Sequence, residues 1–500
     1  MVSTDSQGSY LAAGGARPSL SSDGKVLAFQ SEGRAYHPGD STWNSDIFVK
    51  DLVSGQLIRA SEPILAVGGG DSQSPVLSGD GNVVVFESDA KNLFLNDLSQ
   101  GTQIVAHDLT TGVTTPISIS STGIPADANC VSPSISRDGR FVAFASESNL
   151  LASNDLNQSW DVFLHDRQTG ITELISKAQR GTAAGNSSSP SISGDGRFIA
   201  YHSYAENIAP GDSNGHGDVL LFDRQTSHHS LVSRASSGLQ ANNLSTEPAI
   251  SDDGRYVFFS SWAGNLVPND HNGWQDIFRH EIATGNLIRA SIDRWGTSPN
   301  QPCVSPTPNA DGSKVFFVTE ATDLITPSDI VGTEDVYCHT IASGENQLVT
   351  APNHVRLATP SQRRFFAVDA TGEMTVFESS PSNFDPSRAI TTSEIYLRDS
   401  SGPSLRIEGD CPGTLTLTLY GGTIGQPTAL LFGPAGSFVQ PNGPCQGLTV
   451  DISNPTFAGF AIPGGDTLAT WSTTLPSAAC GLTVQAVDLT KCSVTNPMQL

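Results

Sequence analysis

Basic side chains are scarce in this 500-residue chain, which has 26 Lys and Arg against 50 Asp and Glu and therefore a net charge of -24. A surface this acidic repels phosphate backbones and anionic lipid headgroups. Nucleic acid and anionic membranes are therefore excluded as expected partners, whereas divalent cations, cationic groups and neutral glycans suit the charge. Long apolar runs are also missing, so no transmembrane helix is expected.

The opening stretch, MVSTDSQGSYLAAGGARPSLS, lacks the basic and then apolar regions of a signal peptide. This favours either an intracellular protein or a mature form. The cysteines favour the second, because four of the seven lie in the last 90 residues, and a small β-rich segment with four cysteines is typical of disulfide-stapled extracellular or periplasmic domains. Three pairings are open; proximity favours Cys411–Cys445 and Cys480–Cys492. The odd total leaves at least one thiol free or paired between chains.

Glycine and proline, in contrast, are plentiful, and a repeat of 57–58 residues organises them. One copy begins PSISRDGRFVAF (133–144) and continues with DVFLHD, a Thr-Gly turn and ITELIS. A seventh, degenerate copy is FFAVDATGEMTVF (365–377), which places Asp369 at the Asp-Gly position. The other six copies have Asp23, Asp80, Asp138, Asp195, Asp253 and Asp311 there.

Each copy predicts four short strands. The Asp-Gly pair predicts a two-residue hairpin between the first two strands, and the second strand, apolar at nearly every position, must be buried on both faces. Seven such units predict an all-β, seven-bladed propeller, in which each blade packs on its neighbours. Residues 1–12 are expected to complete the last blade and close the ring.

The pattern P-S-I-S-x-D-G-R-x-V-A-F followed by D-V-F-x-x-D resembles the TolB-like (WD-like) propeller repeat, over about 390 residues. The resemblance implies a fold and a habit of binding. In that family the propeller serves as an interaction platform, or as the lid of prolyl-oligopeptidase-like enzymes that carry a separate α/β-hydrolase domain. The sequence has no alternation of strands and helices that would form such a domain.

The repeat ends near SLRIEGD (404–410), which predicts a propeller over 1–407 and a disulfide-containing β-sandwich over 408–500. The second segment has the pattern C-P-G…G-P-C…A-C-G-L…L-T-x-C. It is similar to a C-terminal domain of secreted planctomycete and myxobacterial proteins. That resemblance implies an extracellular location and no activity.

The stretch GDSNG (211–215) has the Gly-x-Ser-x-Gly form of a hydrolase nucleophile elbow. The elbow needs a strand, a sharp turn and a helix. Here the repeat predicts a strand after Ser213, so we interpret this serine as an ordinary loop residue.

Aspartate pairs six residues apart recur between the second and third strands, where Asn adds an oxygen two residues after the first Asp. Hard oxygens on a tight turn suit calcium. Alternatively, the first Asp caps a turn and the second bonds the backbone. Both interpretations stay open; under the first, blades 4 and 5 should bind best. Blade 2, where Asp97 is followed by Gln103, should bind worst. The pairs are Asp40/Asp46, Asp155/Asp161, Asp212/Asp218, Asp270/Asp276 and Asp329/Asp335, and the candidate ligands are Asp155, Asn157, Asp161, Asp212, Asn214, Asp218, Asp270, Asn272 and Asp276.

Aromatic residues gather in the loops that the repeat places at one end of the propeller. Exposed aromatics there would suit sugar stacking or a protein interface. Alternatively, each ring packs over its own hairpin. The candidates are Trp43, Trp160, Trp262, Trp274, Trp295 and Tyr204.

No convergent catalytic set stands out. His107, His165, His280 and His339 share one repeat position and so lie one per blade, whereas an acid–base or metal cluster needs convergence. The sequence therefore predicts a secreted, non-enzymatic propeller that binds protein or glycan or assembles as a homo-oligomer. The alternative is a polysaccharide lyase or glycoside hydrolase using His202, Glu87 or Glu378 at the loop-rich end.

Overall fold

The computed structural model describes residues 14–32, 44–64, 69–94, 99–178, 183–325, 334–350, 365–379 and 394–399, and after these only the strands within residues 404–499. The chain divides into two compact units, Met1–Leu397 and Arg398–Leu500, which are treated separately below. The boundary expected at residue 407 stays a prediction.

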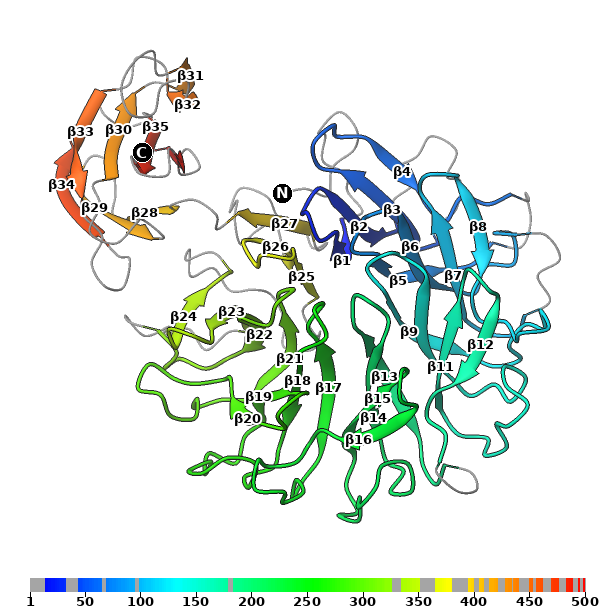
Figure 1. Cartoon of the computed structure of the whole chain (residues 1–500). Helices are drawn as coiled ribbons and strands as arrows, with labels where there is room; N and C mark the ends of the chain where they lie inside the picture. The colour runs from blue at the N-terminus through cyan, green and yellow to red at the C-terminus, as the bar shows by residue number, and fades with distance from the viewer. Residues whose placement is uncertain are drawn as a thin grey trace. The chain divides into compact units, whose positions relative to one another are not determined.

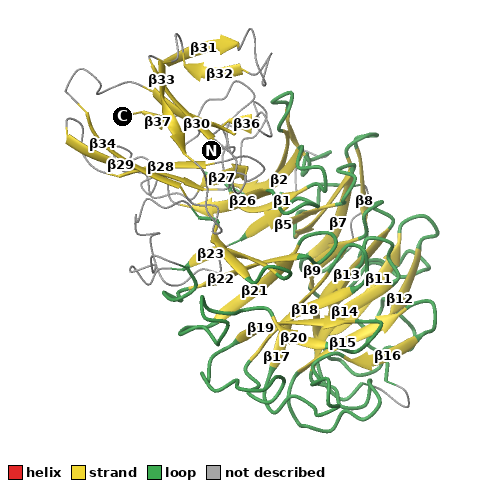
Figure 2. Ribbon diagram, turned by 60° about the vertical axis from the view of Figure 1, so that its left-hand side comes forward, coloured by secondary structure: helices red, strands yellow, loops and turns green. Residues whose placement is uncertain are grey.

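The first unit is a seven-bladed β-propeller, as the repeat predicted (Figure 1). Six blades are four-stranded antiparallel sheets whose strands follow chain order, here called a to d from the axis outward. The a strands of successive blades contact one another around the ring, and β1 of blade 1 contacts β25 of blade 7. Across the described ranges there is no helix, and only strands and loops appear in Figure 2.

The blade strands have the following bounds. Blade 1 has β1 (Ala16–Leu20), β2 (Val26–Ser31), β3 (Asp46–Asp51) and β4 (Leu57–Arg59). Blade 2 has β5 (Ser72–Leu77), β6 (Val83–Ser88), β7 (Gln103–Asp108) and β8 (Val113–Pro116). Blade 3 has β9 (Cys130–Ile135), β10 (Phe141–Ser146), β11 (Asp161–Asp166) and β12 (Ile171–Leu174). Blade 4 has β13 (Ser187–Ile192), β14 (Phe198–Ser203), β15 (Asp218–Asp223) and β16 (His228–Leu231).

Blade 5 has β17 (Ser245–Ile250), β18 (Tyr256–Ser261), β19 (Asp276–Glu281) and β20 (Leu287–Arg289). Blade 6 has β21 (Cys303–Pro308), β22 (Lys314–Thr319), β23 (Asp335–Thr340) and β24 (Glu345–Leu348). Blade 7 has β25 (Phe366–Val368), β26 (Met374–Ser379) and β27 (Glu394–Asp399). Residues 1–12, expected to complete blade 7, lie outside the described residues, so the clasp stays a prediction.

The core is a series of layers between neighbouring blades. Every residue of β6, β10 and β18 is buried, because each b strand is covered on both faces by the adjacent sheets. One layer packs Val85 and Ile104 of blade 2 against Val142 and Phe163 of blade 3. A blade therefore cannot bury its apolar side chains without both neighbours.

The Asp-Gly turns differ from the predicted two-residue hairpins. Ser21 N–H donates to Val26 O at 2.9 Å, so the hydrogen-bonded pair encloses the four residues 22–25. In this turn only the glycine, Gly24, has a positive φ. Asp23 Oδ1 accepts hydrogen bonds from Ser21 Oγ and from the Lys25 amide.

Blade 7 departs from the repeat. Its left-handed glycine is Gly372, so Thr371 occupies the place of the turn aspartate. Asp369 lies two residues earlier, where its Oδ1 accepts the amides of Glu373 and Met374. The assignment of Asp369 to the Asp-Gly position was therefore wrong.

The same turns close the ring. In the described residues, backbone hydrogen bonds link the a–b turn of each blade to the next, and Ala370 N donates to Ser22 O at 2.9 Å across the junction of blades 7 and 1. The remaining links are Ser22–Gly79, Asp80–Arg137, Arg137–Gly194, Gly194–Asp252, Asp253–Ala310 and Ala310–Ala370.

The second unit is also built of antiparallel strands, as expected for a small β-sandwich. Strands of its two larger sheets contact each other. One sheet has β28 (Ser404–Glu408), β29 (Gly413–Tyr420) and β34 (Ala469–Leu475); another has β33 (Thr456–Ala461), β30 (Thr428–Gly433), β35 (Thr483–Asp488), β36 (Ser493–Val494) and β37 (Met498–Gln499); the third has β31 (Ala435–Val439) and β32 (Thr449–Ile452). Cys411, Cys445, Cys480 and Cys492 lie outside the described residues, so their pairing stays a prediction.

Candidate functional site

The two ends of the propeller differ in exposed apolar surface. The b–c and d–a loops share one end, because antiparallel strands b and d finish where c and a begin; we call it the loop end. Of the twelve large apolar side chains exposed among the described residues, nine lie in b–c or d–a loops, and three lie in or beside the c–d turns. The nine are Ile64, Ile124, Leu150, Leu156, Tyr204, Leu239, Trp262, Trp274 and Trp295; the three are Val53, Val113 and Ile171.

Blades 4 and 5 hold the aromatic part of this surface. Trp295, 65% exposed, lies in the d–a loop after β20, with the Arg294 guanidinium 4.1 Å from the centre of its ring. Tyr204 follows β14, and its ring meets the His202 imidazole edge to face at 4.8 Å. Trp160 is half-buried, and Trp43 lies outside the described residues.

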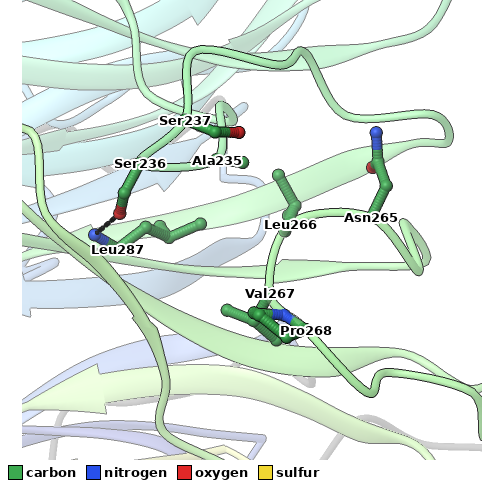
Figure 3. A pocket seen from close by; sticks show the side chains of 8 residues that line it. All are labelled: Ala235, Ser236, Ser237, Asn265, Leu266, Val267, Pro268 and Leu287. Atoms are coloured by element: carbon green, nitrogen blue, oxygen red, sulfur yellow. Dashed lines mark hydrogen bonds between the residues drawn. The ribbon is translucent and has the colours of Figure 1, made fainter.

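A shallow hollow of about 370 Å³ also lies at blades 4 and 5 (Figure 3). Leu266, Val267 and Pro268 of a b–c loop form much of its apolar wall. Ser236 Oγ accepts the Leu287 amide at 2.8 Å, which ties a d–a loop to the next blade. The side chains that line the hollow are apolar or neutral and polar.

The innermost strands carry a ring of strained residues that the sequence analysis missed. In six blades the residue before the repeated proline has a positive φ at a bulge of strand a, although none of the six is glycine. Such backbone is uncommon and clusters at functional sites. The regular spacing of the repeated proline, preceded by Arg, Ser or Glu, was the available signal. The residues are Arg17, Ser74, Ser132, Ser189, Glu247 and Ser305.

Side chains from strand b of the preceding blade bond some of these strained amides. Glu87 Oε1 accepts the Ser132 amide at 2.8 Å, and Gln30 Oε1 accepts the Ser74 amide at 3.1 Å. Burial raises the pKa of Glu87, while Arg17 and the hydrogen bonds act against that rise. Polar groups of adjacent blades thus meet at bulges of the innermost strands.

The residues of the catalytic alternative are not assembled. Burial lowers the pKa of His202 to about 4, and its Nε2 atom has no hydrogen-bonding partner. Both carboxylate oxygens of Glu87 accept hydrogen bonds, one from the Ser132 amide and one from Gln73 Nε2. No hydrogen bond or ion pair joins His202 to Glu87 or Glu378 in the part of the chain that the structure describes.

The b–c loops of blades 4 and 5 place amide nitrogens against their second aspartates. Asn214 Nδ2 donates to Asp218 Oδ2 at 2.7 Å, and Asn272 Nδ2 donates to Asp276 Oδ2 at 3.1 Å. Each asparagine oxygen accepts a backbone amide two residues later, as in an Asx-turn. Burial raises the pKa of Asp276 to about 7.

In several blades an arginine acts on a carboxylate of the aspartate pair. Arg59 Nη2 lies 2.7 Å from Asp46 in blade 1, Arg289 Nη1 lies 3.7 Å from Asp270 in blade 5, and Arg234 lowers the pKa of Asp212 in blade 4. Burial nevertheless leaves the pKa of Asp212 raised to about 6. Asp40, Asp97 and Asp329 lie outside the described residues.

Other singled-out residues have structural roles. His165 Nδ1 bonds Thr172 Oγ1 at 2.9 Å, and the related histidines lie one per blade. Ser213 is exposed, with a strand rather than a helix after it. Cys130 and Cys303 are buried free thiols at the start of strand a, where blades 2, 4 and 5 have serine.

Among the described residues, no three His, Cys, Asp or Glu side chains cluster as a metal-binding group. No helix there is long and apolar enough to cross a bilayer.

Comparison with known proteins gives structural likenesses only. No protein-family model matches the sequence, and no curated protein matches it. Similar structures include a TolB protein from Agrobacterium tumefaciens (15% identity, 55% of this chain and 80% of that chain, TM-score 0.35) and TolB from Acinetobacter baumannii (14%, 75% and 74%, TM-score 0.35). A puromycin-hydrolysing peptidase from Mycobacterium tuberculosis is similar at 12% identity, 82% of this chain, 59% of that chain and a TM-score of 0.43. At these values no activity is transferred to this chain.

Proposed function

We propose that this protein is an extracellular or periplasmic propeller that binds a protein or glycan partner through its loop end and catalyses no reaction. The observation that carries the proposal is the concentration of exposed apolar side chains in the b–c and d–a loops. Contiguous exposed apolar surface marks interaction sites on soluble proteins. The location rests on the four C-terminal cysteines.

Glycan binding and self-association are the two forms of this function that the aromatics favour. Tryptophan and tyrosine present a flat apolar face together with a polar handle, which suits both sugar rings and protein hot spots. The strongly acidic composition makes a neutral glycan, or a surface with cationic groups, the better match.

The test compares two full-chain variants. The loop-end variant combines Tyr204→Ala, Trp262→Ala, Trp274→Ala and Trp295→Ala, and the control combines Val53→Ala, Val113→Ala and Ile171→Ala at the other end. Binding to immobilised xylan, cellulose and chitin is measured, together with self-association by sedimentation velocity. We expect the loop-end variant to lose binding or self-association at least about tenfold, as for hot-spot aromatics, and the control to behave as wild type.

Equal losses in both variants would contradict the proposal. So would depolymerisation of any of these polysaccharides that is abolished by Glu87→Gln or His202→Gln, because that result would establish the lyase or hydrolase alternative instead.

A further inference from the structure

The b–c loop of blade 3, between β10 and β11, buries two carboxylates for which the described residues provide no counter-charge. Asp155 is 3% exposed and Asp161 is fully buried. Neither oxygen of Asp155 has a partner in hydrogen-bonding geometry among the described residues, and Asp161 Oδ2 has none there either, although the Asn157 backbone amide lies near Asp155 and the Asn157 side-chain amide lies near Asp161. Asp155 is close enough to Asp161 to raise its pKa by charge repulsion. Burying unpaired charges is costly, so this arrangement calls for a positive group.

Blades 1, 4 and 5 each supply an arginine, and blade 2 has the neutral amide of Gln103 in place of the second carboxylate. Blades 1 and 5 place Arg59 and Arg289 in strand d, whereas blade 3 has Leu174 at that position. In blade 4 the positive group is Arg234. The residue at the same repeat position of blade 3 is Lys177, which is exposed and has its Nζ atom 5.9 Å from the centre of the Phe222 ring in the next blade.

Blade 2 shows which groups surround the repeat position of Asp161, where it has Gln103. There Gln103 Nε2 donates to Gln100 O at 2.6 Å and to Ala128 O at 3.3 Å. A positively polarised group therefore faces two backbone carbonyls. By repeat position, the equivalent carbonyls of blade 3 belong to Gln158 and Gly185. With a carboxylate in place of the amide, this donor is lost, and the described side-chain donors near Asp161 are Ser176 and Asn157.

We propose that the blade 3 loop binds one divalent cation of the calcium type, with Asp155 and Asp161 as its anionic ligands and loop carbonyl oxygens completing the shell. Calcium accepts six to eight oxygens in irregular geometry, which suits a loop better than the strict octahedron of magnesium. This site differs from the two that the residue types alone favoured. In blades 4 and 5 an asparagine N–H donates to the second carboxylate and an arginine acts on the first, whereas in blade 3 Asn157 lies near Asp161 but no cation among the described residues acts on Asp155.

The experiment uses the full chain and terbium as a luminescent substitute for calcium. Trp160 precedes Asp161 in the sequence, so terbium in this loop should emit on tryptophan excitation. We expect saturable emission that calcium displaces, and loss of most of it in Trp160→Phe, which keeps both carboxylates. Millimolar calcium should raise the melting temperature by several degrees over chelator-treated protein.

Two substitutions assign the site. Asp155→Asn should abolish the calcium shift and remove one ion per chain in equilibrium dialysis, whereas Asp212→Asn, the matched change in blade 4, should leave both unchanged. Without calcium, Asp155→Asn should melt no lower than wild type, because it removes an uncompensated charge.

Three results would overturn the proposal. The first is a wild-type melting temperature that is the same with calcium as with chelator. The second is calcium binding that survives Asp155→Asn, or terbium emission that survives Trp160→Phe. The third is a loss of stability in Arg180→Gln that calcium does not alter, since this arginine, which lies outside the described residues, would then be the counter-charge.

Discussion

Blades 2 and 3 are neighbours that share a core layer, a strand plan and a buried histidine–threonine pair, yet they begin strand c differently. In blade 2, Gln103 Oε1 accepts the Ser118 hydroxyl at 2.8 Å; in blade 3, Asp161 Oδ1 accepts the Ser176 hydroxyl at 2.5 Å. The fold therefore needs an acceptor at this position but not a charge. The fold does not require the second carboxylate oxygen of the other blades, which Arg59 contacts in blade 1 and an asparagine N–H contacts in blades 4 and 5.

The largest expected effect comes from removing such a group. Arg59→Leu leaves the buried Asp46 carboxylate without the guanidinium that lies 2.7 Å away. Breaking a buried pair by removing one partner costs about 3–5 kcal/mol. We expect a matching drop in the free energy of unfolding, measured by urea titration.

The double variant Asp46→Asn/Arg59→Leu serves as its control. It removes both charges and should recover much of the loss. If Arg59→Leu alone unfolds at the wild-type urea concentration, the idea that blade 1 must neutralise this oxygen fails.

A somewhat smaller effect should follow from making blade 2 resemble its neighbours. Gln103→Glu keeps the length of the side chain. It places a carboxylate near two carbonyl oxygens that, in the wild type, accept hydrogen bonds from the Gln103 amide. The lost hydrogen bonds and the buried charge should cost about 2–4 kcal/mol. Urea unfolding in the presence of chelator measures it, with Gln225→Glu on an exposed c–d turn as the control. A Gln103→Glu protein as stable as wild type would show that blade 2 tolerates the charge and that the comparison between these blades has no energetic basis.

This comparison also marks what the sequence could predict. The repeat placed the b strands between two sheets, and β6 and β10 are buried throughout. Blade number, strand order and the loop end followed from it. The spacing of Asp155 and Asp161 likewise identified them as a pair.

The counter-charges could not be predicted in the same way. Arg59 acts on Asp46 from strand d, thirteen residues later, and Lys177 and Arg234 have the same repeat position but different surroundings. Where a long side chain goes depends on packing that a repeat does not encode. The Asp-Gly pair misled for a related reason, because Ser21 and Lys25 hydrogen bonds open the turn to four residues.

The histidine–threonine pair, which blades 2 and 3 share, predicts a pH effect. Burial lowers the pKa of His165 to about 4, against about 6.5 in an unfolded chain. The neutral form therefore stabilises the fold above pH 6.5, and that contribution is lost as the pH falls toward 4, because the unfolded state takes up the proton first.

Between pH 7 and pH 5 this histidine should cost wild type about 2 kcal/mol of stability. His165→Gln should lose that much less over the same interval in urea unfolding, and the exposed His228→Gln should not differ from wild type. An identical pH response in all three proteins would contradict the assignment of His165 as a neutral buried group.

The smallest effect is expected at the start of strand a, where blades 2 and 3 differ by one atom. Ser72 Oγ and Ser88 Oγ are 2.9 Å apart in blade 2, whereas Cys130 Sγ lies 3.3 Å from Ser146 Oγ in blade 3. Burial raises the pKa of the Cys130 thiol to about 12, so it remains a neutral and unreactive group.

Cys130→Ser should reproduce the serine pair of blade 2 and change the free energy of unfolding by less than about 0.5 kcal/mol. Cys130→Ala removes the hydrogen-bonding partner of Ser146 and should lower the free energy of unfolding by about 1 kcal/mol. If Cys130→Ser destabilises the protein more than Cys130→Ala, the sulfur is needed for packing rather than as a hydrogen-bonding group, and the two blades are not interchangeable at this position.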